Sequence, residues 1–101
     1  MKKVRVHKAA ERETNEALIR YAEVNYELWH RFENEVSSAV SSAASHPLRY
    51  PIYLHGTRRI LLKSFPYLVV FLDWRDEIYV VAVAHAKREP GYWKHRVEEE
   101  P

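Results

Sequence analysis

The sequence predicts an α+β domain in which a helical hairpin packs on a mostly antiparallel, four-stranded sheet. Neither Gly nor Pro occurs between Met1 and Pro47, and apolar residues recur there at helical spacing. Residues 58–85 instead contain short apolar segments separated by turn residues, which is typical of strands. One alternating segment precedes the helices, so the predicted order is β-α-α-β-β-β, in a single domain over residues 1–101.

The N-terminal half is predicted as one short strand followed by the hairpin. Val4 and Val6 alternate with polar neighbours, which indicates a strand with one buried face. One uninterrupted helix over residues 9–46 would be about 57 Å long, which is too long for a domain of this size. We expect a break at Asn25, because Asn favours caps and the apolar phase is least regular there. The helices then cover about residues 9–24 and 26–46.

The C-terminal half is predicted as three strands that follow a loop. The middle strand is apolar on both faces and is therefore expected to be central. In the last strand, Ala82 and Ala84 are placed on the face of Val80, where small side chains would let the helices approach closely. The loop is predicted at residues 47–57, the strands at 58–63, 68–72 and 78–85, and a polar tail at 86–101.

The composition excludes several classes of site. The chain has no Cys, which excludes disulfides and thiolate metal sites, and its two Gly are too few for a Rossmann fingerprint or a P-loop. None of its six His lies three or four residues from another, so we expect neither a metal ion nor a cofactor. The longest apolar-rich run covers residues 65–74, far short of a membrane span, and the basic N-terminus lacks the apolar segment of a signal peptide. We therefore expect a cytoplasmic protein.

Several motifs stand together with this order of elements. They are a helix ending at His46-Pro47, a strand with Arg58-Arg59, a turn Phe65-Pro66-Tyr67, and a closing segment His85-x-x-Arg88-x-Pro90-x-Tyr92-Trp93. Over nearly the whole chain, this combination resembles the RelE/ParE superfamily of toxins, the toxin halves of type II toxin–antitoxin modules, often called plasmid stabilisation proteins. The resemblance implies a protein that arrests growth until a cognate antitoxin protein binds it.

The resemblance leaves the target of the toxin open. ParE-type members inhibit DNA gyrase by binding, whereas RelE-type members cleave mRNA in the ribosome. We favour a ParE-like inhibitor of a topoisomerase, because a net charge of +2 is small for a protein that handles RNA. A RelE-like, metal-independent mRNA endoribonuclease is the alternative, and a non-toxic binding module of the same fold is a third reading. Whether the protein forms a homodimer is also left open by the sequence.

A ribonuclease would need side chains that move protons and stabilise a phosphorane. If the protein is one, we expect catalysis from Arg59, Lys63, His85, Arg88 and Tyr92. Alternation along the strand places Arg59, Leu61 and Lys63 on one face, where a basic surface could form. The structural alternatives are edge charges that prevent strand pairing, a partly buried His85, and a Tyr92 that packs the tail against the sheet.

The helices carry two further sets of residues. Glu13 and the other helical carboxylates are predicted to form a solvated face. The aromatic residues Tyr21, Tyr26, Trp29 and Phe32 are expected mostly in the core. Tyr26 and Trp29 lie close to the predicted break, and one that proved exposed there would be an anchor for a binding partner.

Overall fold

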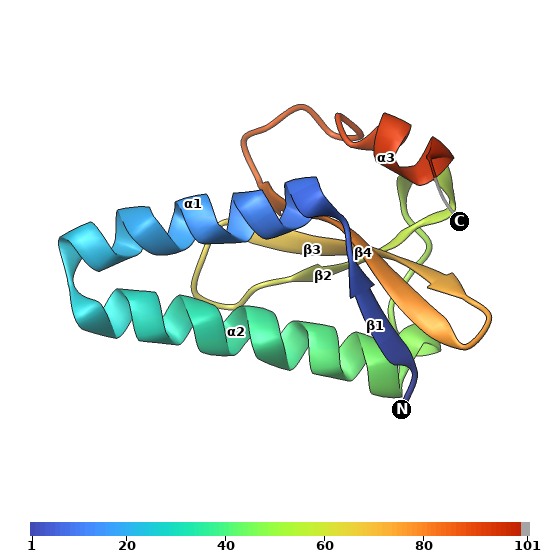
Figure 1. Cartoon of the computed structure of the whole chain (residues 1–101), viewed down its shortest axis with the longest axis horizontal. Coiled ribbons are helices and arrows are strands. Elements are labelled where there is room, and N and C mark those ends of the chain that lie inside the picture. Colours follow the sequence, from blue (N-terminus) through green and yellow to red (C-terminus); the bar gives the residue numbers. More distant parts are fainter. Residues whose placement is uncertain (100–101) are drawn as a thin grey trace.

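The computed structural model describes residues 1–99, in which two long helices lie on one side of a four-stranded sheet (Figure 1). The strands are β1 (Lys3–Val6), β2 (Arg58–Leu61), β3 (Tyr67–Trp74) and β4 (Glu77–His85), and the helices are α1 (Lys8–Val24), α2 (Tyr26–Ser45) and α3 (Lys94–Glu98). Two 3-10 turns, Pro47–Arg49 and Leu54–Gly56, lie in the predicted loop. The predicted α+β class and the β-α-α-β-β-β order are confirmed.

The sheet is mixed. Its strand order is β1-β4-β3-β2. The strands β2, β3 and β4 pair antiparallel, whereas β1 pairs parallel with β4 because the whole hairpin separates β1 from its partner. The strands β1 and β2 therefore form the two edges.

The break in the hairpin falls at Asn25, as predicted. Asn25 has an extended backbone and ends α1, while its side-chain carboxamide oxygen accepts the backbone N–H of Leu28 at 2.9 Å and so caps α2. At the other end of α1, the Nδ1 atom of His7 accepts the backbone N–H of Ala9 at 2.9 Å. Local capping thus fixes where both helices begin.

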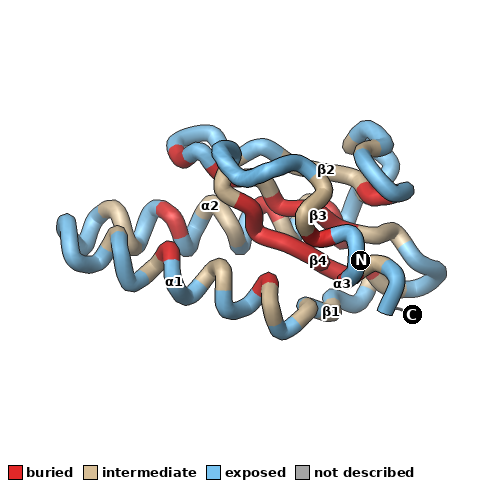
Figure 2. Tube along the Cα trace, turned by 90° about the horizontal axis from the view of Figure 1, so that it is seen from above, coloured by how far each residue is buried: buried red, intermediate tan, exposed pale blue. Residues whose placement is uncertain are grey.

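The larger core lies between the helices and the sheet. Phe32 of α2 is fully buried, and its ring lies 5.1 Å from the rings of both Phe65 and Tyr67. Figure 2 shows β4 as the longest buried segment, with α1 and α2 exposing most of their outer faces. Tyr21 and Phe32 belong to this core as expected, but Tyr26 is 71% exposed.

A β-bulge changes the faces of β4. Val70 pairs with Ala82 and Phe71 pairs with Val80, so Val81 is left without a partner across the strand pair. The extra residue moves Ala82 and Ala84 away from the helices, while Val80 stays against them. The predicted shared face of these three residues is therefore wrong.

The C-terminal segment forms a third layer on the opposite face of the sheet. Trp93 is only 1% exposed and belongs to a second core with Val70, Ala82 and Ala84. The short helix α3 follows, so the predicted polar tail is folded over residues 86–99, and its last two residues lie outside the described residues. No helix within residues 1–99 is both long and apolar enough to cross a membrane.

Candidate functional site

Glu13 of α1 lies at the centre of a bonded cluster that holds the C-terminal segment. Its carboxylate accepts two hydrogen bonds from the guanidinium of Arg96, at 3.0 and 2.9 Å, and one from the backbone N–H of Val83 at 3.0 Å. The side chains of Glu13 and Arg96 are 10% and 8% exposed. The prediction that Glu13 lies on a solvated face is therefore wrong. Its place between the buried residues Ala10 and Ala17, at helical spacing, was the signal in the sequence.

Tyr92, a predicted catalytic residue, belongs to the same cluster. Its hydroxyl donates to the carboxylate of Glu13 at 2.6 Å. Burial raises the pKa of Tyr92 well above its usual value of 10.0, and the bond to the Glu13 carboxylate raises this pKa further. The phenol therefore keeps its proton at neutral pH and is occupied as a donor.

Arg88 and His85 lie beside Tyr92. The guanidinium of Arg88 is 3.6 Å from the centre of the Tyr92 ring, and one of its nitrogens is 3.4 Å from the Glu13 carboxylate. The Nδ1 atom of His85 accepts the backbone N–H of Lys87 at 3.1 Å, and its ring meets that of Tyr67 edge-on at 5.0 Å. His85, Arg88 and Tyr92 together line a small pocket of about 30 Å³.

Arg59 and Lys63 are separated in the structure. The guanidinium of Arg59 lies 4.5 Å from the centre of the Tyr53 ring, and Tyr53 lines the pocket of His85 and Tyr92. Lys63 instead follows the end of β2 and lies beside α2, because the strand ends at Leu61 and its alternation does not continue. Arg59 and Leu61 do alternate with Ile60 along β2, so the predicted common face is wrong only for Lys63. The structure thus brings four of the five predicted residues to one region and leaves Lys63 elsewhere.

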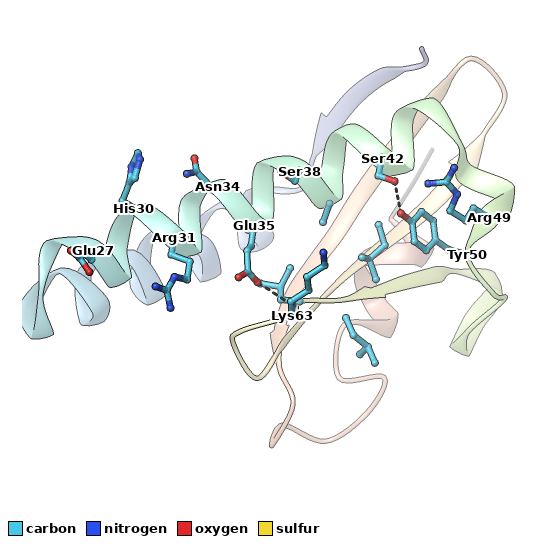
Figure 3. Close-up of a pocket in the computed structure, with 14 residues that line it drawn as sticks. Glu27, His30, Arg31, Asn34, Glu35, Ser38, Ser42, Arg49, Tyr50 and Lys63 are labelled. Atoms are coloured by element: carbon cyan, nitrogen blue, oxygen red, sulfur yellow. Dashed lines mark hydrogen bonds between the residues drawn. The ribbon is translucent and has the colours of Figure 1, made fainter.

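A groove lies between α2 and the edge strand β2 (Figure 3). It has a volume of about 790 Å³, and its floor includes Ala39, Ile60 and Leu62. One carboxylate oxygen of Glu35 links the two walls of the groove by accepting the backbone N–H groups of Lys63 and Ser64, at 3.0 and 3.1 Å. No pattern in the sequence indicates this groove, because it joins residues of two elements that are far apart in the chain.

The groove is lined by more basic than free acidic groups. Arg31, Arg49 and Lys63 line it, against the carboxylates of Glu27 and Glu35, of which Glu35 is already bonded to the backbone. The hydroxyl groups of Ser42 and Tyr50 bond to each other across one end (Figure 3). Leu61 is 61% exposed on the rim, on a strand that among residues 1–99 pairs with β3 and, by one bridge, with Ile52. The groove therefore combines an apolar floor, an open strand edge and positive charge.

Within the described part of the chain, no group of three or more His, Asp or Glu side chains could hold a metal ion.

Comparisons with known proteins identify one family and one solved structure of the same fold. A family model described as the ParE toxin of a type II toxin–antitoxin system, parDE, matches residues 4–90. A solved structure described as the chromosomal ParDE toxin–antitoxin system from P. aeruginosa matches with a TM-score of 0.73 at 14% identity. The match covers 86% of this chain and 98% of that one, and at this identity it shows a shared fold. Among curated proteins, none matches the sequence.

Proposed function

The chain belongs to the ParE toxin family of type II toxin–antitoxin systems, and we propose that it arrests growth by binding and inhibiting a topoisomerase, DNA gyrase. A cognate antitoxin would relieve this inhibition by binding the toxin. The proposal makes the protein a binding inhibitor and assigns it no catalysed reaction.

The observation that carries the proposal is the bonding of Tyr92. A ribonuclease needs a group that gives or takes a proton near neutral pH. The Tyr92 hydroxyl is held by the Glu13 carboxylate, and its raised pKa makes it a poor acid or base there. A catalytic role for Arg59, Lys63, His85, Arg88 and Tyr92 remains a prediction that applies only if the protein cleaves RNA.

The distribution of cations also supports binding over cleavage. RNA cleavage on a toxin surface requires several cations around one phosphate. Arg59 stacks on Tyr53 and Arg88 on Tyr92, so both share one region, but Arg96 is buried against Glu13 and Lys63 lies at the α2 groove. In addition, the C-terminal segment with Trp93 covers much of the sheet face on which an open basic surface was expected.

We further propose that the antitoxin binds in the α2–β2 groove. The open edge of β2 can pair with an extended strand, and the apolar floor can receive every second side chain of that strand. Arg31, Arg49 and Lys63 favour an acidic segment. A partner of that chemistry would cover the exposed Leu61.

The function is tested by expressing the protein in bacteria with and without the protein encoded by the neighbouring reading frame. We expect growth arrest without that partner and recovery with it. Purified toxin should then inhibit supercoiling by gyrase, while primer extension on cellular mRNA should show no new cuts. Codon-linked cuts together with unaffected supercoiling would favour the ribonuclease reading, and unaffected growth at good expression would reject a toxin.

The antitoxin site is tested with Leu61→Asp, which adds a negative charge to a groove expected to bind an acidic segment. Because Leu61 is exposed, the variant should fold normally and still arrest growth. We expect weaker antitoxin binding in a calorimetric titration. Leu48→Asp is the matched control, since Leu48 is 74% exposed and does not line the groove. Equal affinities of the two variants and the wild type would exclude the groove.

A further inference from the structure

Three aromatic rings lie together at the start of α2, next to the turn of the hairpin. Tyr26, Trp29 and His30 have ring centres 5.5 to 6.3 Å apart, and their planes differ by only 9 to 21°. We call this cluster the tip platform. The hairpin turn projects beyond the sheet in Figure 1, so the platform lies at a free end of the molecule.

The tip platform is largely exposed although it is aromatic, since Tyr26 and His30 are exposed and Trp29 is half-buried. Tyr26 is 71% exposed, and Val24, on the other side of the capping residue Asn25, is 67% exposed. Tyr26 lies outside the core, to which the same helix contributes Phe32. Large exposed aromatic residues that lie close together are typical of surfaces that bind another molecule.

Carboxylates surround the platform. Tyr26, Trp29, His30 and Glu33 stand at i, i+3, i+4 and i+7, so Glu33 extends the same face of α2. Glu27 is adjacent in α2 and Glu23 ends α1 nearby. Among residues 1–99, none of these three exposed carboxylates has an ion pair, whereas buried carboxylates such as Glu13 are fully bonded.

The neighbouring cations are directed elsewhere. Arg31 leaves α2 on the side opposite to His30 and lines the α2–β2 groove (Figure 3). The guanidinium of Arg20 donates to the hydroxyl of Tyr67. The platform therefore offers flat aromatic faces and a negative rim, without a cation of its own.

We propose that the tip platform binds an arginine-bearing segment of the protein that the toxin inhibits. A guanidinium is planar, stacks on aromatic rings and pairs with carboxylates at the same time, which matches this set of groups. A negative rim would repel a phosphate backbone, so nucleic acid is the disfavoured partner. This inference rests on the proposed function and names the surface that contacts the target.

The platform and the groove are then separate surfaces that meet at His30, which lines both. An antitoxin seated in the groove would lie next to the platform and obstruct a large target there. The antitoxin would then neutralise the toxin by blocking access of the target to the platform, without any change in the shape of the toxin.

The test compares growth arrest, binding to purified DNA gyrase and binding to the antitoxin for platform variants. Tyr26→Ala is the main variant, because its high exposure leaves the fold intact, and Tyr26→Ala with Trp29→Ala removes most of the aromatic surface. We expect the double variant to bind gyrase roughly 30-fold more weakly, the effect of losing one binding hot spot, and to arrest growth poorly. Antitoxin affinity should be unchanged. Trp74→Ala is the control, since Trp74 is a 40% exposed aromatic residue in the β3–β4 hairpin.

Charge variants test the arginine chemistry. Glu33→Lys should weaken gyrase binding more than Glu33→Gln does, because it adds repulsion to the loss of the carboxylate. Stronger binding of Glu33→Lys would indicate an anionic partner and overturn the proposal.

Two further outcomes separate the proposals. A wild type that arrests growth and a Tyr26→Ala, Trp29→Ala variant that arrests it equally well would reject the platform and leave the proposed function standing. Loss of antitoxin binding with full arrest would assign the platform to the antitoxin and likewise overturn the inference. A wild type without any effect on growth would reject the proposed function and the inference with it.

Discussion

Replacing Glu13 by Ala should cause the largest loss of stability among single replacements of the carboxylates on the helices. Glu13 accepts hydrogen bonds from Arg96, Tyr92 and the backbone of Val83, and so joins α1, β4 and the C-terminal segment. The substitution leaves the Arg96 guanidinium buried without its counter-charge, and its Nε atom already lacks a hydrogen-bond partner. Arg96 must then either lose its burial or remain as an unpaired charge.

The size of the effect follows from this burial. Removing one partner of a buried ion pair costs about 3–5 kcal/mol, because the other charge stays desolvated. For a domain of about 100 residues, each kcal/mol lowers the melting temperature by about 4–8 °C. We therefore expect the melting temperature to fall by about 12–40 °C. The loss of about 3–5 kcal/mol is a large part of the free energy of unfolding of a typical domain.

The assay is thermal unfolding followed by circular dichroism, with urea unfolding for variants that fold reversibly. Glu16→Ala is the matched control, because Glu16 lies on the exposed face of the same helix, and its loss should change stability by less than about 0.5 kcal/mol. The double variant Glu13→Leu, Arg96→Met removes both charges and should be more stable than Glu13→Ala. A melting temperature of Glu13→Ala within about 5 °C of the wild type would refute the reasoning.

Three further predictions concern Tyr92, Asn25 and Gly91. Folding raises the pKa of Tyr92 above 10.0. The contribution of the protonated phenol to stability is therefore complete below pH 10 and is lost as the pH rises through the folded-state pKa. In urea unfolding, the stability of the wild type should fall more steeply above pH 10 than that of Tyr92→Phe. Asn25→Ala should cost about 1 kcal/mol in urea unfolding because it removes the cap of α2, and Asn25→Asp should restore most of it. Gly91→Ala should destabilise by about 1–2 kcal/mol, since Gly91 has φ +83° and an added Cβ would lie 3.1 Å from the Nε2 atom of His55. A Gly91→Ala variant as stable as the wild type in thermal unfolding would contradict the expected strain at Gly91.

The features that the sequence predicts correctly depend on neighbouring residues. The hairpin break could be found because Asn25 caps α2 with its own side chain, through a bond to a residue three positions away. The two helices and the order of the elements follow from the same kind of local pattern, namely periodicity, caps and Pro47.

The features that were missed depend on distant partners. The bulge at Val81 comes from the pairing of β4 with β3, and no single residue in β4 indicates it. The bonded state of Glu13 depends on Arg96, which lies 83 positions later, and the groove joins α2 to β2. The predicted face of Arg59 and Lys63 failed for another reason, because β2 ends before Lys63 and strand alternation ends with it.

The β-bulge in β4 and the packing of the C-terminal segment depend on each other. A strand in a two-layer protein needs only one apolar face, but β4 is buried on both, from Ile78 to Ala84. The helices cover one face, and a large side chain, Trp93, has to fit on the other. If the same sequence ran through β4 without a bulge, regular alternation would put the two alanines on the helix face with Val80, and valine side chains would stand where Trp93 packs. The bulge therefore places the small side chains of β4 under the largest buried one, which holds the C-terminal segment over the sheet and leaves the groove and the tip platform as the open binding surfaces.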